Sequence, residues 1–244
     1  MQPPSVSDLL RSWEVGLSLL PHERALLLLQ VTHPATSADH LAQLSIGRRD
    51  ALLLKVRESL FGPQFTSQAV CPHCGEQLEV NFDVPSILID EPDAGDVPVS
   101  VSFGGHDLVF RLPNSQDLAA VIAEPDDSVR QRTLLGRCIC SAAADGTQLT
   151  ADQLPKAIAE SIESRMAELD PQANMELNLL CPGCEHNWLA PFDIASFLWT
   201  EINAWARRML QEVHLLASSY GWSEHDILSM HPVRRQLYLQ MVCR

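Results

Sequence analysis

The amino-acid sequence predicts an α+β fold, with mainly helical N- and C-terminal parts around a small antiparallel β region. Three observations support this class. Apolar residues recur at three- and four-residue steps near both ends of the chain, short runs of β-favouring residues fill the middle, and similar Cys-Pro-x-Cys motifs begin at Cys71 and Cys181. With 244 residues, 46% of them hydrophobic, the chain is long enough to bury a core.

The first sixty residues predict three helices. Ser7 is expected to cap the first helix, and Pro21 suits the first turn of another. The pattern over residues 46–61 predicts a third helix, which Gly62 and Pro63 end. The basic residues of this third helix predict a solvated face: they are Arg48, Arg49, Lys55 and Arg57.

The middle of the chain mixes strand and helix patterns. Gly104 and Gly105 predict the turn of a hairpin, and the acidic, proline-containing stretch 90–98 predicts a loop. Asn114 or Ser115 is expected to cap a helix. Further helical patterns cover residues 134–144 and 150–169. The predicted strands are residues 78–82, 97–103, 108–112 and 176–180.

The C-terminal part carries the longest helical pattern of the chain, over residues 194–220, and Gly221 ends it. Ser223 and Asp226 then predict a capped short helix. Residues 232–242 predict a last one.

Charge and hydropathy limit the classes of function. The 31 acidic residues outnumber the 17 basic ones, and the net charge of -14 argues against a nucleic-acid partner. No apolar run approaches the roughly 20 residues that a membrane span requires, and no export signal is visible. We therefore expect a soluble protein of the bacterial cytoplasm, in which cysteines serve as thiols or metal ligands.

One sequence pattern occurs twice. The stretches CPHCGEQLEVNFDV, from Cys71, and CPGCEHNWLAPFDI, from Cys181, lie 110 residues apart. Each contains a Cys-Pro-x-Cys knuckle, a strand-like segment and a Phe-Asp-aliphatic triplet. Phe82 and Phe192 each lie eleven residues beyond the first cysteine of their copy.

The paired knuckles predict a four-cysteine zinc ribbon. Zinc favours four ligands in a tetrahedron, and each knuckle presents two thiolates, so the expected ligands are Cys71, Cys74, Cys181 and Cys184. Such a site would tether two halves of the chain across a loop of about a hundred residues. Four cysteines fill the coordination sphere, so we expect a structural Zn²⁺ and no catalysis.

Other thiol and imidazole roles receive less support. A redox pair would use one knuckle that opens a helix, whereas both knuckles precede strand patterns. His73 and His186 lie beside the knuckles and are expected to be solvent-facing turn residues. Structural thiols are expected at Cys138 and Cys140, on a predicted helix, and at Cys243.

These patterns divide the chain into five expected regions. An N-terminal helical region spans residues 1–66, the first zinc knuckle and strand 67–90, and a central mixed region 91–175. The second zinc knuckle spans 176–194, and a C-terminal helical region spans 195–244.

Aromatic residues concentrate in the C-terminal region, where such side chains anchor either a core or a protein interface. No phosphate-binding loop, nucleophile elbow or His-Glu-x-x-His helix is present. The candidate contacts for a protein partner are Trp199, Trp205, Tyr220, Trp222, Arg234 and Arg235.

The sequence resembles the baseplate proteins, often called hub assembly chaperones, of T-even-like myophages and extracellular contractile injection systems. The resemblance covers residues 40–84 and 130–242. Its most specific elements are the paired knuckles and the run from Glu212-Val213-His214 to Tyr220-Gly221-Trp222-Ser223. The tail from Arg234-Arg235 to Tyr238 adds support, whereas residues 91–123 contribute nothing to it.

The resemblance implies a non-enzymatic role through protein contacts in a contractile tail. The implied partners are baseplate hub, spike or other tail proteins, with no nucleic acid, membrane or small-molecule substrate. The protein is then either an assembly chaperone or a resident part of the baseplate. Two other interpretations stay open: a zinc-ribbon regulator that binds nucleic acid or transcription machinery, and a zinc enzyme in which one cysteine is not a ligand.

Overall fold

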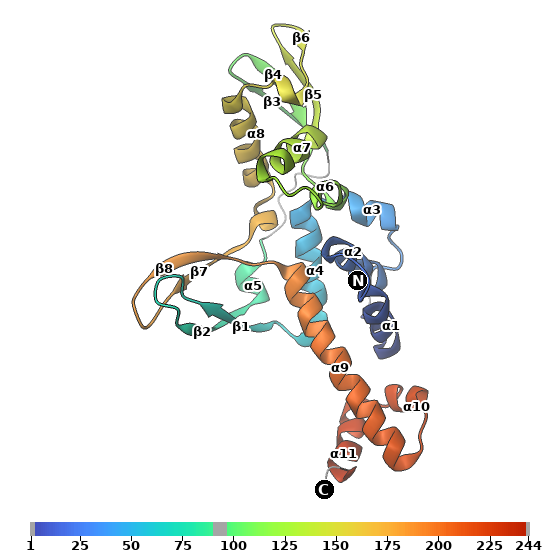
Figure 1. Cartoon of the computed structure of the whole chain (residues 1–244). Coiled ribbons are helices and arrows are strands. Elements are labelled where there is room, and N and C mark those ends of the chain that lie inside the picture. The colour runs from blue at the N-terminus through green and yellow to red at the C-terminus, as the bar shows by residue number, and fades with distance from the viewer. Residues whose placement is uncertain (1–2, 90–96, 243–244) are drawn as a thin grey trace. The chain divides into compact units, whose positions relative to one another are not determined.

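The computed structural model describes residues 3–89 and 97–242, so Cys243 and most of the predicted loop at 90–98 lie outside the described residues (Figure 1). Helices and small antiparallel sheets make up the fold, which confirms the predicted α+β class. The chain forms two compact units: Met1–Pro34 with Ala195–Arg244, and Ala35–Ile194. None of the described helices combines the length and apolar character that a membrane crossing demands.

The first unit joins N-terminal helices to the long C-terminal helix. Ser5, rather than the expected Ser7, caps the first helix by accepting a 3.1 Å hydrogen bond from the Asp8 N–H. The Trp13 indole donates to Asn203 at 3.0 Å, and the ring of Trp199 lies so close to Gly16 that a Cβ there would meet it at 2.3 Å. The helices are α1 (Val6–Gly16), α2 (Pro21–Thr32), α9 (Ile194–Tyr220), α10 (Glu224–Leu228) and α11 (Pro232–Val242).

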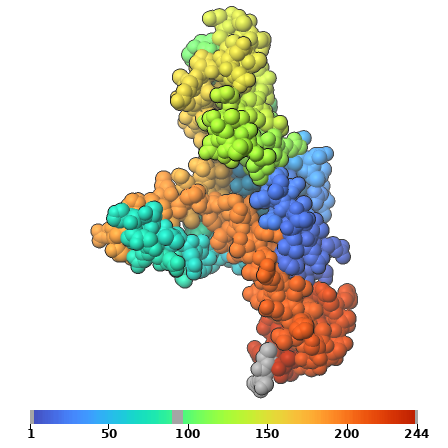
Figure 2. Space-filling model, in the orientation of Figure 1, coloured from blue at the N-terminus to red at the C-terminus, as the bar shows by residue number. Residues whose placement is uncertain are grey.

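The last helices of this unit form a small lobe, red in Figures 1 and 2. Its core holds Leu216, Ile227 and Leu239, with Trp222 and Tyr238 packed against them. A buried ion pair at 2.9 Å joins α9 to α11 through Glu212 and Arg235. We call α9 from residue 203 onward, with α10 and α11, the C-terminal lobe.

The second unit begins with two helices, so the first sixty residues hold four helices where the sequence predicted three. The basic face predicted for α4 is only partly solvated. Arg49 and Arg57 are buried. Arg49 pairs with Asp50. The Arg57 guanidinium donates to the Gly62 carbonyl at 2.6 Å and lies 3.8 Å over the Phe65 ring. The two helices are α3 (Ala38–Gln43) and α4 (Ile46–Phe61).

This unit contains a four-stranded antiparallel sheet in the order β3-β4-β5-β6, at one end of the unit (Figure 1). One face packs against α7 and α8 through a core that includes Leu108, Phe110 and Ile162. The segment 134–144, predicted to be helical, divides after Cys138 into the end of α7 and strand β5, so Cys140 lies on a strand. The strands are β3 (Val99–Phe103), β4 (His106–Phe110), β5 (Ile139–Ala144) and β6 (Thr147–Gln148).

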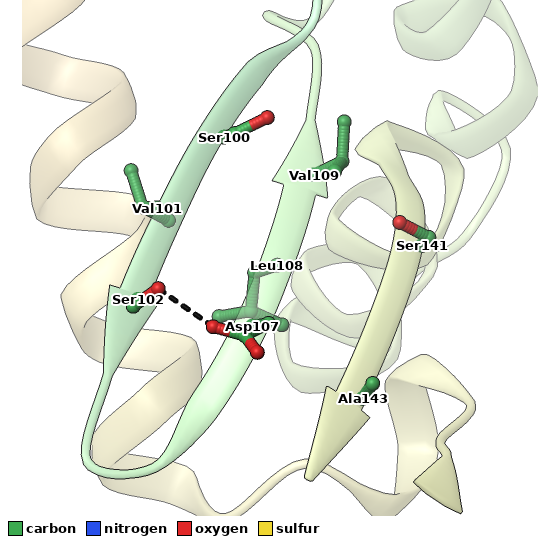
Figure 3. A pocket seen from close by; sticks show the side chains of 8 residues that line it. All are labelled: Ser100, Val101, Ser102, Asp107, Leu108, Val109, Ser141 and Ala143. Carbon is green, nitrogen blue, oxygen red and sulfur yellow. Dashed lines mark hydrogen bonds between the residues drawn. The ribbon is translucent and has the colours of Figure 1, made fainter. Parts of the chain in front are cut away.

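The opposite face of this sheet bears short side chains and a shallow hollow of about 390 Å³ (Figure 3). The Ser102 hydroxyl there donates to Asp107 at 2.6 Å. Helices and turns complete this part of the unit: α6 (Ser115–Val121), α7 (Asp127–Cys138), η1 (Ala151–Gln153), α8 (Lys156–Leu169) and η2 (Pro171–Asn174).

Two separate β-hairpins contain the cysteine knuckles. Strand β1 pairs with β2 and strand β7 pairs with β8, both antiparallel, and burial alternates along each strand. The sequence predicts a strand after each knuckle but does not predict β1. The strands are β1 (Gln64–Val70), β2 (Gln77–Asp83), β7 (Glu176–Leu180) and β8 (Asn187–Pro191), and the short helix α5 (Val84–Ile87) follows β2.

A buried carboxylate holds α6 and α7 to the sheet. Asp117 has a fully buried side chain and accepts hydrogen bonds from Arg111, at 2.5 and 2.9 Å, and from Arg137, at 2.9 Å. Burial alone would raise the pKa of Asp117, but the guanidinium of Arg111, the Asn114 backbone and Arg137 together hold it below its ordinary value. The carboxylate is therefore ionised and fully partnered.

Replacing Asp117 tests this network. We expect Asp117→Ala to lower the free energy of unfolding by about 3 kcal/mol, at the lower end for breaking a buried ion pair, because both arginines keep partial access to water. Urea unfolding followed by circular dichroism measures the change. The matched control is Asp127→Ala, which removes an exposed partner of Arg130 and should change stability by less than about 0.5 kcal/mol. Equal effects of the two substitutions would contradict the role given to Asp117.

Candidate metal centre

The two knuckles fold in the same way. In the first, the Cys71 N–H donates to the Glu76 carbonyl and the Gly75 N–H donates to the Cys71 carbonyl, both at 2.9 Å. In the second, the Cys181 N–H donates to His186 and the Glu185 N–H donates to Cys181, again at 2.9 Å. The sequence repeat is therefore also a repeat of backbone geometry.

This backbone geometry requires a left-handed residue directly after the second cysteine. Gly75 occupies that position in the first knuckle with φ of 78°, which glycine adopts without strain. The second knuckle places Glu185 at the equivalent position with φ of 57°. A residue with a Cβ is strained there, so the second knuckle is the less stable turn.

The knuckles bring all four predicted ligands together. The sulfur of Cys71 lies 3.7 Å from that of Cys184, and the sulfur of Cys74 lies 3.6 Å from that of Cys181. All four sulfurs lie within 4.8 Å of one another. Each short distance joins the first cysteine of one knuckle to the second cysteine of the other, so the knuckles face each other in a cross-paired arrangement.

This donor set fits zinc. Sulfurs about 2.3 Å from a central Zn²⁺ form a tetrahedron with edges of about 3.8 Å, close to the two short distances observed. Cys71 and Cys181 are buried, Cys184 is partly buried and Cys74 is exposed, so the cluster lies at the tip of the hairpins. Within the described ranges, no other group of His, Cys, Asp and Glu side chains converges in this way.

The protonation of the thiols bears on whether this cluster could hold a cation. Burial raises the pKa of Cys71, but backbone N–H groups and the neighbouring thiols outweigh it and lower that pKa to about 7. The backbone of His186 favours the thiolate of Cys184, but burial and the three other sulfurs raise its pKa to about 12. One thiolate therefore forms readily, whereas four thiolates at this spacing require a cation between them.

The residues around the cysteines also follow the repeat. Glu76 and His186 occupy equivalent positions in the two copies, and so do His73 and Gly183. Each residue of the first pair contacts the residue of the second pair that lies on the other knuckle. The Glu76 carboxylate lies against Gly183, where a Cβ would meet its oxygen at 1.9 Å, and the His186 ring stacks on His73 with centroids 5.4 Å apart. His186 also stacks on Trp188 at 6.1 Å. Sequence spacing alone did not show these contacts.

A second cluster closes the other end of the hairpins. Phe65 stacks on Phe82 with centroids 4.7 Å apart, and the Phe192 ring meets Phe65 at 5.6 Å and Phe82 at 5.3 Å, edge to face. Phe82 and Phe192 are the equivalent phenylalanines of the sequence repeat. The hairpins are thus joined at both ends, by sulfur at the tip and by aromatic rings at the base.

The repeat ends in a helix start in both copies. Asp83 accepts a hydrogen bond from the Ser86 N–H at 3.0 Å, and helix α5 begins at the buried Val84. In the second copy, Asp193 precedes Ile194, which is buried and begins α9. The Phe-Asp-aliphatic triplet therefore turns the chain from a ribbon strand into a helix.

Buried carboxylates lie near this base. Asp50 pairs with Arg49 at 2.7 Å, and both side chains are almost fully buried. Burial raises the pKa of Asp50 to about 6 despite Arg49, and the carboxylates of Asp193 and Asp170 add to the rise. Asp170 accepts from the Gly47 N–H at 2.9 Å, and burial raises its pKa as well.

The candidate partner contacts lie in the first unit and differ in exposure. Trp199 is 9% exposed and lies under the Arg24 guanidinium, 4.6 Å from it, and Arg235 is 4% exposed and bound to Glu212. Both side chains are therefore engaged within the chain. Trp205 and Trp222 are half-buried, Tyr220 stacks on Trp222 at 4.5 Å, and Arg234 is exposed.

Two hairpins that carry four converging thiols above a packed aromatic base define a cysteine ribbon of the metal-binding type. The profile of the family described as T4 bacteriophage base plate protein matches residues 20–199, which include both knuckles. The chain therefore belongs to that family, which confirms the resemblance seen in the sequence. Comparisons with curated proteins and with solved structures gave no match.

The knuckle turns provide a paired test. We expect Glu185→Gly to leave the fold intact and to raise stability by about 1 kcal/mol, because it relieves a left-handed residue that carries a Cβ. Gly75→Val should instead destabilise the ribbon by more than about 1 kcal/mol, since a β-branched residue is strained in that region. Thermal unfolding of both variants beside wild type measures the difference, and changes of the same sign would contradict the assignment.

The buried Asp50 predicts a specific pH dependence. Its folded-state pKa lies above its unfolded value, so its favourable contribution is complete below pH about 4 and is lost as pH rises through about 6. Between these pH values the wild-type protein should lose on the order of 2–3 kcal/mol of its free energy of unfolding because of Asp50, and Asp50→Asn should not show this loss. Urea midpoints from pH 4 to 7 measure it. The control is Asp39→Asn, which removes an exposed carboxylate of the same unit, and parallel curves for wild type and Asp50→Asn would refute the prediction.

Proposed function

We propose that this protein is a non-enzymatic baseplate component whose ribbon holds one structural Zn²⁺ through Cys71, Cys74, Cys181 and Cys184. The observation that carries this proposal is the convergence of four thiols from two knuckles of a chain that belongs to a base plate family. Four thiolates complete the coordination of zinc and leave no position for a substrate, so the metal acts in structure.

Zinc in this site would fix the points at which the chain leaves the ribbon. The two closest pairs of sulfurs join cysteines that lie 107 and 113 residues apart in the sequence. A two-stranded hairpin is only marginally stable alone, so the ion stabilises both hairpins at once. In this proposal the knuckle regions 67–90 and 176–194 join the other three expected regions, which are the helical ends 1–66 and 195–244 and the central region 91–175.

The proposed activity is contact with hub, spike or other tail proteins, made in the bacterial cytoplasm while the tail assembles. Family membership supports tail proteins as the class of partner. The candidate contacts that have accessible surface are the ones we propose to touch a tail protein: Trp205, Tyr220, Trp222 and Arg234. Trp199 and Arg235 support the fold around them instead.

Mass spectrometry of purified particles tests the baseplate role. We expect the chain at a stoichiometric level relative to other baseplate proteins if it is resident, or in assembling cells but not in finished particles if it is a chaperone. Particles that assemble normally in cells lacking the chain would overturn both forms of the proposal.

Metal analysis tests the zinc. We expect about one Zn²⁺ per chain bound through sulfur alone, as measured by elemental analysis and X-ray absorption. Cys181→Ser should abolish stoichiometric zinc and lower the unfolding midpoint, because a structural site contributes its binding energy to folding. Cys140→Ser, which changes an exposed thiol on strand β5, is the control and should keep the metal. A mixed sulfur and oxygen shell would sink the structural assignment.

A further inference from the structure

Helix α11 has two apolar faces, and residues 3–89 and 97–242 cover only one of them. Arg235, Tyr238, Leu239 and Val242 face the core of the C-terminal lobe. Along the same helix, Val233, Leu237 and Met241 are 62%, 51% and 63% exposed. With 3.6 residues per turn, Leu237 lies about 200° from Leu239, on the far side of the helix.

The three exposed residues form a continuous stripe, because residues four apart stack along one helix face. We call Val233, Leu237 and Met241 the outer stripe. Single exposed apolar residues are ordinary on protein surfaces, but a helix that is apolar on opposite faces is typical of one buried from both sides. The outer stripe is thus the unpartnered half of such a helix.

Charge identifies what would cover it. Helix α11 contains no carboxylate, and Arg234 is exposed beside the outer stripe. On α9 from residue 203, Arg207 and Arg208 are exposed, whereas the one carboxylate, Glu212, is buried against Arg235. The C-terminal lobe therefore carries four arginines against three carboxylates in a chain of net charge -14.

The same charges disfavour a second copy of this chain as the occupant. A two-fold packing of two outer stripes would give Arg234 of each copy no acidic partner on the facing helix, because α11 contains no carboxylate. A groove with carboxylates at its rim would provide one.

We propose that the outer stripe of α11 docks into an apolar groove rimmed by carboxylates on another protein of the baseplate. In this mode the three side chains at four-residue spacing act as anchors and Arg234 pairs with the acidic rim. The inference rests on the proposed function for the location of its partner, but it adds a surface and a partner chemistry which that function does not specify.

Site-specific photocrosslinking in assembling cells tests this docking. The full chain carries p-benzoylphenylalanine at position 237 of α11, and the matched control carries it at 211, an exposed position of α9. We expect an adduct from position 237 alone, with another tail protein, mapped by mass spectrometry to apolar residues flanked by Asp or Glu. Arg234→Glu should reduce the adduct at least about tenfold, while Arg234→Lys retains it.

Three results would overturn the inference: an adduct with a second copy of this chain, no adduct at all, or an adduct indifferent to Arg234→Glu. A second measurement guards against misfolding. The triple variant Val233→Ser, Leu237→Ser and Met241→Ser should keep the wild-type melting temperature, because these side chains are exposed, yet lower particle yield. The control variant, with Val15, Leu17 and Leu20 changed to Ser, removes three other exposed apolar side chains from the same unit and should not lower the yield.

The failure of this inference is distinguishable from failure of the proposed function. Normal particles from the outer-stripe variant, in cells where deletion of the whole chain prevents assembly, would reject the docking surface alone. Normal assembly without the chain would reject the baseplate role itself.

Discussion

The structure of the second unit depends on the meeting of four sulfurs that the chain supplies from two distant knuckles. All four lie within 4.8 Å of one another. Although the His186 backbone favours its thiolate, burial and the three neighbouring sulfurs raise the pKa of Cys184 to about 12. A divalent cation reverses the repulsion between thiolates into attraction. Because each hairpin has only two strands, neither buries enough surface to be stable alone. The four cysteines could hold a metal ion at the tip of the hairpins, and the packing of Phe65, Phe82 and Phe192 joins the hairpins at their base.

Much of this site could be predicted from the sequence, because the repeat fixes it locally. Two knuckles at a constant offset, each followed by Phe-Asp-aliphatic, indicate one site used by both copies, and helix α9 follows from uninterrupted apolar periodicity. Strand β1 was missed because its sequence, QFTSQAV, has few β-branched residues and its identity depends on pairing with β2. Cys140 was misplaced for a related reason. The change from helix to strand after Cys138 follows from pairing of β5 with β4, which no local signal marks.

Charged and aromatic residues were harder to place, because their environment is set by tertiary contacts. Arg57 was expected in solvent, yet it is buried between the end of α4 and the Phe65 ring. Arg235 and Arg234 are neighbours with opposite fates: one is buried against Glu212, the other is exposed. Helical periodicity tells a buried residue from an exposed neighbour only when it is known which face of the helix meets the core. Trp199 shows the same dependence, since its burial follows from the absence of a side chain at Gly16.

The departures from the repeat show which of its features the ribbon requires. Both copies keep the cysteines, the knuckle hydrogen bonds, the packed phenylalanine and the helix start, so the meeting of the thiols and the turn into a helix depend on these features. The residues at the cross-contacts differ: a carboxylate lies against glycine on one side, and two imidazoles stack on the other. Glu185 even accepts a left-handed backbone where its counterpart is glycine. Glu185 is strained in this backbone, and the geometry of the four sulfurs does not require its side chain. The two knuckles are therefore alike in backbone hydrogen bonds and different in the side chains that surround their cysteines.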